Sequence, residues 1–168
     1  MRKEYKDITQ AINDIAEEIN SVLNNRNKEK YFQGIILLYS FIENILKWLV
    51  FVKILWEKAD KELPEEEVNS LQSFCKKLSF YNALNIALSI DLIDFRLYKR
   101  INAIREERNN VIHQFWIYRQ RNNLLVLRKK LEKLARVSNQ LVGIFNQLTQ
   151  EIGIEEIYEI FLYRATKN

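Results

Sequence analysis

The sequence is poor in the residues that build tight turns and disulfide bonds. Its 168 residues include three glycines, one proline and one cysteine. So little glycine and proline argues against a sheet protein, which needs frequent tight turns, and favours long helices. The single cysteine, Cys75, excludes a disulfide within one chain, and no Cys-x-x-Cys or Cys/His spacing of a zinc site occurs. A lone cysteine also fits a reducing cytosol.

The chain also contains little histidine and has only a small net charge. The chain has one histidine and no cluster of His, Asp and Glu spaced as metal ligands, so we expect no metal and no other cofactor. Lys and Arg outnumber Asp and Glu by only 26 to 22. This mild excess suits an anionic partner such as RNA, and it suits an ordinary basic surface equally well.

One hydrophobic run, Gly34–Trp56, has the length of a membrane span, but it carries Glu43, Lys47 and Lys53. On insertion scales each Ile, Leu, Phe or Val gains roughly 0.3–0.6 kcal/mol, whereas one central charge costs roughly 2.5–3.5 kcal/mol. The charges offset most of the gain, so we interpret the run as a helix in a bundle core. The first residues, MRKEYKDITQ, contain no apolar signal region, and we therefore expect a cytoplasmic protein that does not bind membranes.

Apolar residues recur at helical spacings of three and four along almost the whole chain. A third helical region is interrupted near Ser79, a residue type favoured at N-caps, and the stretch SIDLID after it predicts a turn. We expect helices over about 8–22, 31–61, 65–90, 96–118, 127–148 and 154–163. The chain is therefore interpreted as all-α, a single helical bundle of five to six helices forming one domain over residues 1–168.

Three further features have more ordinary interpretations. Trp48 and Trp56 lie on the apolar second helix and are interpreted as core residues. The charge run RKKLEKLAR, residues 128–136, is interpreted as a solvated helix face, with an RNA-binding track as the alternative. The C-terminal stretch YEIFLYRATKN either docks on a partner subunit or caps its own bundle.

The helix expected over 96–118 carries a charge among apolar residues. With a rotation of about 100° per residue, its apolar side chains cluster within about 60° of one direction, and Arg108 lies at the middle. An unpaired charge there is costly to desolvate, so Arg108 requires a carboxylate, a phosphate or a wet interface. The apolar stripe consists of Ile101, Ile104, Val111, Ile112 and Phe115.

Glu43 lies on a largely apolar face of the second helix and is a candidate partner for Arg108. Two opposite charges on adjacent helices would each offset the desolvation cost of the other. The alternative is that Glu43 pairs with Lys47, four residues later, which is worth roughly 0.2–0.5 kcal/mol. We favour the pair with Arg108.

His113 lies about 140° around the helix from Arg108. Asn109 and Trp116 share its flank and Arg105 borders it, so polar, cationic and aromatic groups converge there. A single helical histidine is often an ordinary surface residue. Imidazole can also exchange protons near neutral pH, which makes a role in acid–base chemistry the competing interpretation.

The stretch RNNVIH, residues 108–113, resembles the R-x(4–6)-H signature of the HEPN superfamily, a group of small all-α proteins in which Asn after the Arg is typical. The stretches LYKRINAIREE and LSFYNALNIALSIDLID look like the third and fourth helices of that family. IILLYSFIENILKWLV is similar to its early helix, where Ser40 and Glu43 fit a Ser/Glu pattern. The resemblance covers roughly residues 31–148.

The resemblance implies a metal-independent endoribonuclease that acts as a homodimer, with two R-x4-H motifs facing each other in a basic cleft. By this resemblance His113 would be the general acid or base, and Arg108 would hold the scissile phosphate. Asn109 would orient the phosphate or His113, and Arg105 would support phosphate binding. The expected products carry a 2′,3′-cyclic phosphate and a 5′-hydroxyl.

The sequence departs from the family at one position. In HEPN toxins paired with nucleotidyltransferase antitoxins, the motif commonly continues as R-x(4)-H-x-Tyr, and adenylylation of that tyrosine inactivates the toxin. Phe115 stands there and has no hydroxyl, and Tyr118 is out of register. We therefore expect a toxin-like or antiviral defence protein of another HEPN group, with RNA and an antitoxin or defence protein as partners.

Two other functions stay open. Some HEPN proteins are non-catalytic modules that bind RNA, a nucleotide or a partner protein. A plain helical scaffold, in which Arg108 and Glu43 pair for structural reasons alone, is the third possibility.

Overall fold

The described part of the chain consists of helices and short connections, without a strand. The computed structural model describes residues 2–25, 27–58, 63–114, 117, 120 and 122–151. The described helices are α1 (Arg2–Leu23), α2 (Lys28–Glu57), α3 (Glu65–Lys77), α4 (Phe80–Ser89), α5 (Phe95–His113) and α7 (Leu124–Glu151). The predicted all-α bundle is confirmed.

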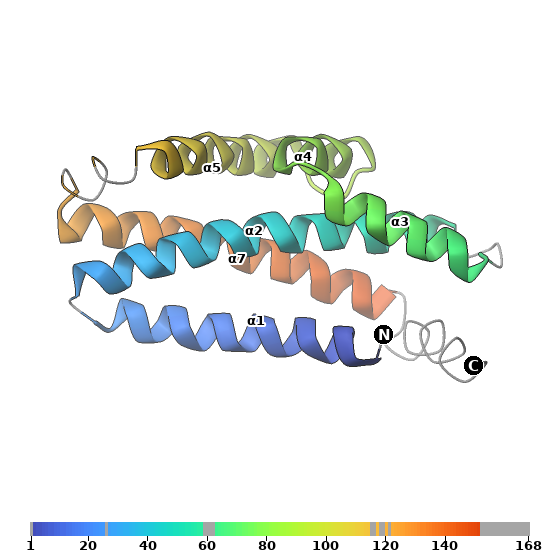
Figure 1. Cartoon of the computed structure of the whole chain (residues 1–168), viewed down its shortest axis with the longest axis horizontal. Helices are drawn as coiled ribbons and strands as arrows, with labels where there is room; N and C mark the ends of the chain where they lie inside the picture. The colour runs from blue at the N-terminus through green and yellow to red at the C-terminus, as the bar shows by residue number, and fades with distance from the viewer. Residues whose placement is uncertain are drawn as a thin grey trace.

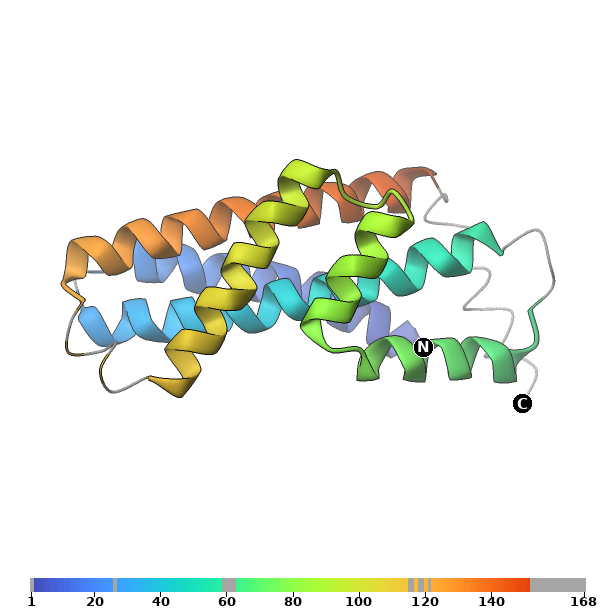
Figure 2. The ribbon, with the colours of Figure 1, turned by 90° about the horizontal axis from the view of Figure 1, so that it is seen from above.

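The helices form three layers (Figure 1). The middle layer contains α2 and α7, which run side by side in the same direction and make the most extensive contact among the described helices. On one side of this pair lies α1, antiparallel to α2. On the other side lie α3, α4 and α5, and Figure 2 shows that α5 crosses the middle layer diagonally.

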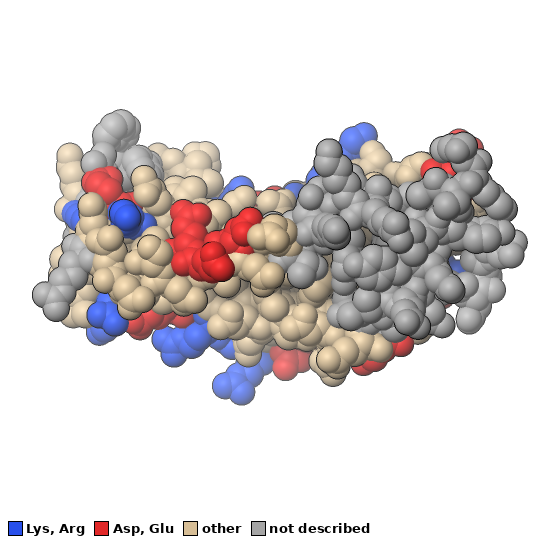
Figure 3. Space-filling view, turned by 90° about the horizontal axis from the view of Figure 1, so that it is seen from below, with Lys and Arg blue, Asp and Glu red and all other residues tan. Residues whose placement is uncertain are grey.

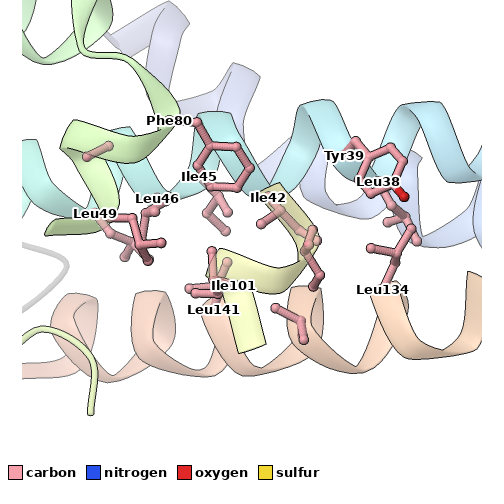
Figure 4. Close-up of a cluster of buried hydrophobic side chains, with 14 of the residues drawn as sticks. Leu38, Tyr39, Ile42, Ile45, Leu46, Leu49, Phe80, Ile101, Leu134 and Leu141 are labelled. Carbon is pink, nitrogen blue, oxygen red and sulfur yellow. The ribbon is translucent and has the colours of Figure 1, made fainter. Parts of the chain in front are cut away.

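The central helix α2 is apolar on most of its circumference, which is why it packs in the middle layer. Its N-cap is Asn27, whose side chain accepts a hydrogen bond from the Glu29 amide at 2.8 Å. Figure 4 shows side chains of α2, α4, α5 and α7 meeting in one cluster. Among them are Leu46, Phe80, Ile101 and Leu134, all buried.

Gly34 lies on α2 where side chains of α1 and α7 approach its backbone closely. A Cβ atom at this position would lie 3.0 Å from Cδ1 of Leu131 and 3.4 Å from both Cδ1 of Ile19 and Cγ1 of Val22. These neighbours belong to α7 and α1, so the missing side chain lets both helices pack closely against α2.

The membrane-length run corresponds to α2. Among the described residues α2 is the helix that is long and apolar enough to cross a membrane by length and composition, and more than half of its most apolar window is buried inside the bundle. Its predicted position in a bundle core is therefore confirmed. The expected cytoplasmic location stays a prediction.

Two predicted local features that place α4 and α5 are confirmed. The helical region after residue 65 breaks at Ser79, whose Oγ accepts the Asn82 amide at 3.1 Å and caps α4. The predicted turn follows α4 and includes Asp91 with a φ of 53°, in the left-handed region. Asp94 then caps α5 by accepting the Leu97 amide. The chain therefore folds back, so that α5 packs against α4.

Other predictions need correction or fall outside the described residues. The helix expected to reach Tyr118 ends at His113, because Gln114 adopts a non-helical conformation with φ −122°. Trp48 and Trp56 are half-buried at the edge of the core rather than inside it, and the Trp48 ring lies 5.4 Å from that of Phe145. The helix expected over 154–163 and the C-terminal stretch lie outside the described residues.

Candidate functional site

The candidate site is carried by the C-terminal half of α5. Ile101, Ile104 and Val111 are buried against the layer below, and Arg108 belongs to the same face, as its periodicity predicts. Ile112 differs from the prediction, because it is exposed and not part of the buried stripe. The buried face is therefore narrower than the sequence suggests, and α5 ends two residues beyond its last buried contact.

Arg108 forms the predicted ion pair with Glu43 of α2. Its Nη2 lies 2.9 Å from Oε2 of Glu43. The Glu43 side chain is 15% exposed and that of Arg108 is 30% exposed. The nearly buried carboxylate on α2 therefore fixes the arginine, while part of the Arg108 side chain stays exposed to solvent.

The alternative partner of Glu43 is also present. Nζ of Lys47 lies 2.7 Å from Oε1, the other oxygen of the Glu43 carboxylate. The two pairings that the sequence offers as alternatives therefore coexist, one on each oxygen. The three side chains together carry two positive charges and one negative charge, so this cluster of Glu43, Lys47 and Arg108 has a net charge of +1.

His113 is the last residue of α5 and is exposed. No residue in the described part of the chain makes a hydrogen bond or ion pair with its imidazole. The sequence prediction placed Trp116 beside it by extending the helix. Because α5 ends at His113, this reasoning does not hold, and Trp116, Phe115 and Tyr118 lie outside the described residues.

Arg108 and His113 leave α5 in different directions. Five helical residues correspond to about 7.5 Å along the axis and a rotation of about 140°. Arg108 points into the contact with α2, whereas His113 is exposed. The two groups of one chain therefore border two different surfaces of the same helix end.

The predicted supporting residues lie on the flank of α5. Asn109 is half-buried one residue after Arg108. Arg105 donates from Nε to Oδ1 of Asn102 at 3.0 Å, and its Nη2 lies 3.3 Å from Glu106. Arg105 is thus directed away from the Glu43 cluster, and its role in phosphate binding stays a prediction.

A second ion pair of α5 was missed by the sequence reasoning. Glu107, next to Arg108, pairs with Lys130 of α7, whose side chain is only 11% exposed. Consecutive residues of α5 therefore bind the two helices of the middle layer. The interpretation of residues 128–136 as a solvated face is wrong for Lys130. Its position three residues after Leu127 and four before Leu134, both fully buried, is the signal that could have found it.

The Lys130–Glu107 pair predicts how stability changes with pH. Burial lowers the pKa of Lys130, although Glu107 opposes the effect. The unfolded chain therefore binds this proton more readily than the folded chain, so the free energy of unfolding gains a contribution as pH rises towards the usual lysine pKa of about 10.4. In urea unfolding, the wild type should gain stability relative to Lys130→Met between about pH 7 and pH 10. A difference that is constant or falls would contradict this prediction.

Comparisons with family models, curated proteins and solved structures give no match to this chain. In the described part of the chain, no three His, Cys, Asp or Glu side chains gather in a way that could hold a metal ion.

Proposed function

We propose that this chain is a metal-independent endoribonuclease of HEPN type that acts as a homodimer. The observation that supports this best is the fixed Arg108. Its guanidinium is held by Glu43 through one nitrogen and remains partly exposed. Arginine has five N–H donors, so donors remain to clamp a phosphate. Lys47 leaves the cluster with a net positive charge, which favours an anion beside it.

The reaction needs a base, an acid and a cation beside an RNA phosphate. The 2′-hydroxyl oxygen attacks the phosphorus, its proton goes to a base, and the bond from phosphorus to the 5′-oxygen breaks as that oxygen gains a proton. Imidazole can perform either proton transfer near neutral pH, which suits the exposed His113. Arg108 would stabilise the extra charge on the pentacoordinate phosphate.

A second copy of the chain is part of the proposal because Arg108 and His113 of one chain face different directions. Exposed apolar side chains occur beside His113 on α5 and in the first turn of α7. Ile112 precedes His113, and Leu125 and Val126 lie in the first turn of α7. These side chains would be shielded from water by a second copy, and two copies would then contribute arginine and histidine to one cleft.

Purified protein incubated with single-stranded RNA in excess EDTA tests this proposal. Cleavage that continues in EDTA supports it, whereas loss of cleavage on chelation, or no cleavage under any condition, would contradict it. The wider role, toxin-like or in antiviral defence with an antitoxin or defence protein as partner, is part of the same proposal.

A non-catalytic module that binds RNA, a nucleotide or a partner protein is the second candidate, and a helical scaffold is the third. The ion pair between Arg108 and Glu43 favours them, because this pair gives the half-buried arginine a partner without any ligand.

The variant Glu43→Gln is expected to separate these functions. It removes the charge that fixes Arg108, so the free energy of unfolding should fall by about 1–2 kcal/mol, below the 3–5 kcal/mol of fully buried pairs because Arg108 reaches water. Glu57→Gln is the matched control, since Glu57 forms an exposed i,i+4 pair with Lys53 on the same helix and should change stability by less than about 0.5 kcal/mol. Urea unfolding measures both.

Under the ribonuclease proposal Glu43→Gln also lowers kcat for RNA cleavage by about tenfold or more, because Arg108 is no longer held in place. If Glu43→Gln is destabilised and the wild type binds RNA but does not cleave it, the non-catalytic module is favoured. If Glu43→Gln is destabilised and the wild type neither binds nor cleaves RNA, the scaffold is favoured. Equal stability of Glu43→Gln and the wild type would contradict the structural role of the pair.

A further inference from the structure

Two aromatic rings are exposed on the outer face of α4 and α5. Tyr81, in the first turn of α4, is 49% exposed, and Phe95, the first residue of α5, is 58% exposed. Exposed aromatic rings are available for stacking with flat ligand groups. Tyr81 of α4 lies against Arg105 of α5, and Tyr98, which lies beside Phe95, bonds to Asn85 of α4, so both rings lie along the contact between the two helices.

A cationic side chain lies over each exposed ring and restricts its position. The Arg105 guanidinium carbon lies 5.0 Å from the centre of the Tyr81 ring, and Nζ of Lys99 lies 4.5 Å from that of Phe95. Phe95 is nearly parallel to Tyr98, with ring centres 6.0 Å apart. We call these five residues the α4–α5 aromatic surface.

Hydrogen bonds orient this surface. The hydroxyl of Tyr98 donates to Oδ1 of Asn85 in α4 at 2.9 Å, which fixes the ring that stacks on Phe95. Arg105 donates to Asn102, so the guanidinium over Tyr81 is held at a second point. A surface whose groups are already ordered loses less conformational entropy when a ligand binds.

The α4–α5 aromatic surface leads to the candidate site along α5. Phe95 is ten residues from Arg105, or about 15 Å at 1.5 Å per residue. Asn109 follows one turn after Arg105 on nearly the same flank, and His113 follows one turn after Asn109. An extended ligand that lies on the rings of Phe95 and Tyr81 would therefore reach the end of α5 that holds His113.

Charge favours an anionic ligand on this side of the bundle. Five basic residues against two acidic residues, Glu106 and Glu107, give α5 a net charge of +3. The basic residues are Arg96, Lys99, Arg100, Arg105 and Arg108. On the opposite side, Figure 3 shows a group of acidic side chains to the left of the centre. The helix α1 lies on that side and exposes Asp14, Glu17 and Glu18.

We propose that the α4–α5 aromatic surface binds single-stranded RNA, with bases stacked on Phe95 and on the pair of Tyr81 and Arg105. Arginine planes and aromatic rings stack with any base, and nearby cations pair with the phosphates. Bases in a duplex are already stacked and cannot use these rings. The inference rests on the proposed ribonuclease, because it assigns the substrate strand a path to His113.

Binding of a fluorescent single-stranded RNA, methylated at every 2′-oxygen so that it cannot be cut, tests the inference by anisotropy. Tyr81→Ala and Phe95→Ala should each raise Kd by about tenfold, because each variant removes the ring on which one base stacks. Tyr81→Phe keeps the ring and should bind like the wild type. Phe74→Ala is the matched control, since Phe74 is an exposed ring of α3 and should leave Kd unchanged.

The salt dependence of the same Kd tests whether the cationic side chains of this surface contact RNA phosphates. Lys99→Gln should reduce the slope of log Kd against log salt by about 0.7, the value for one phosphate contact on a single strand. An unchanged slope would contradict a phosphate contact at Lys99 and overturn this part of the inference.

The outcomes separate this inference from the proposed function. If the wild type binds the methylated strand through Tyr81 and Phe95 but does not cut unmethylated RNA, the RNA surface stands and the ribonuclease proposal fails. If it cuts RNA while the alanine variants bind like the wild type, the inference is overturned. If Tyr81→Ala and Phe95→Ala weaken binding to a double-stranded RNA as much as binding to the single strand, the inference is also overturned. It is overturned as well if the wild type binds no RNA. Circular dichroism melting confirms that the compared variants are folded.

Discussion

Replacing His113 by alanine is expected to lower RNA cleavage by at least about a hundredfold while the protein stays folded. A positioned general acid or base typically contributes a factor of about 10²–10⁴ to the rate. His113 is exposed at the end of α5 and makes no hydrogen bond or ion pair with the described part of the chain, so its loss should change the free energy of unfolding by less than about 0.5 kcal/mol. Single-turnover cleavage and urea unfolding measure the two quantities.

Arg108→Ala should reduce cleavage to a similar extent for a different reason. A donor aimed at developing negative charge is worth a factor of about 10²–10³. Glu43 is not left unpaired in this variant, because Lys47 stays on its other oxygen, and the fold should therefore survive. Arg108→Lys should recover little activity, since an ammonium group lacks the planar fork that clamps a phosphate.

Arg100→Ala is the matched control for both variants. Arg100 lies on the same helix but binds Gln140 of α7, with Nη1 2.7 Å from Oε1, and should leave the rate of the chemical step unchanged. If His113→Ala or Arg108→Ala cleaves RNA as fast as the wild type, the assigned roles are wrong. Equal losses in all three variants would indicate a general effect of charge or folding on the assay.

Leu46→Ala is expected to have the largest effect on stability. Leu46 is fully buried on α2 within the cluster that unites α2, α4, α5 and α7 (Figure 4). Removing three carbons from such a site costs about 2–5 kcal/mol, because the loss of apolar burial adds to the cost of the cavity. Urea unfolding followed by circular dichroism gives this difference.

Ile36→Ala on the same helix is the control, because Ile36 is exposed and a loss below about 1 kcal/mol is expected. Equal losses for both variants would contradict the position of α2 at the centre of the bundle. The comparison is independent of function, so it tests the fold even if no RNA is cleaved.

The helices were predictable because each depends on local sequence and on one periodic apolar face. Ser79 illustrates this, since an N-cap side chain acts within three residues of its own position. The end of α5 was missed for the opposite reason. Residues 114–118 have no proline or glycine to stop a helix, and an apolar pattern continues through Ile117, so nothing local marks His113 as the last residue.

Contacts between helices were predictable only where a charged side chain lies on an apolar face and therefore needs a partner of opposite charge. Arg108 interrupts an apolar stripe, and Glu43 lies on an apolar face, so the pair could be inferred. That Lys47 and Arg108 bind the same Glu43 carboxylate at once could not be inferred, because it depends on the side-chain geometry at the α2–α5 contact. Lys130 was hidden within a run of charges whose other members are largely exposed.

The proposed role of Arg108 and His113 is to promote attack by the 2′-hydroxyl of RNA on the neighbouring phosphate. Mass spectrometry of the fragment ends, produced from one RNA in EDTA, tests this claim most directly. The wild type should yield 2′,3′-cyclic phosphate and 5′-hydroxyl ends, with no fragments from the same RNA methylated at its 2′-oxygens and almost none from His113→Ala. Ends with a 3′-hydroxyl and a 5′-phosphate, or cleavage of the methylated strand, would contradict it.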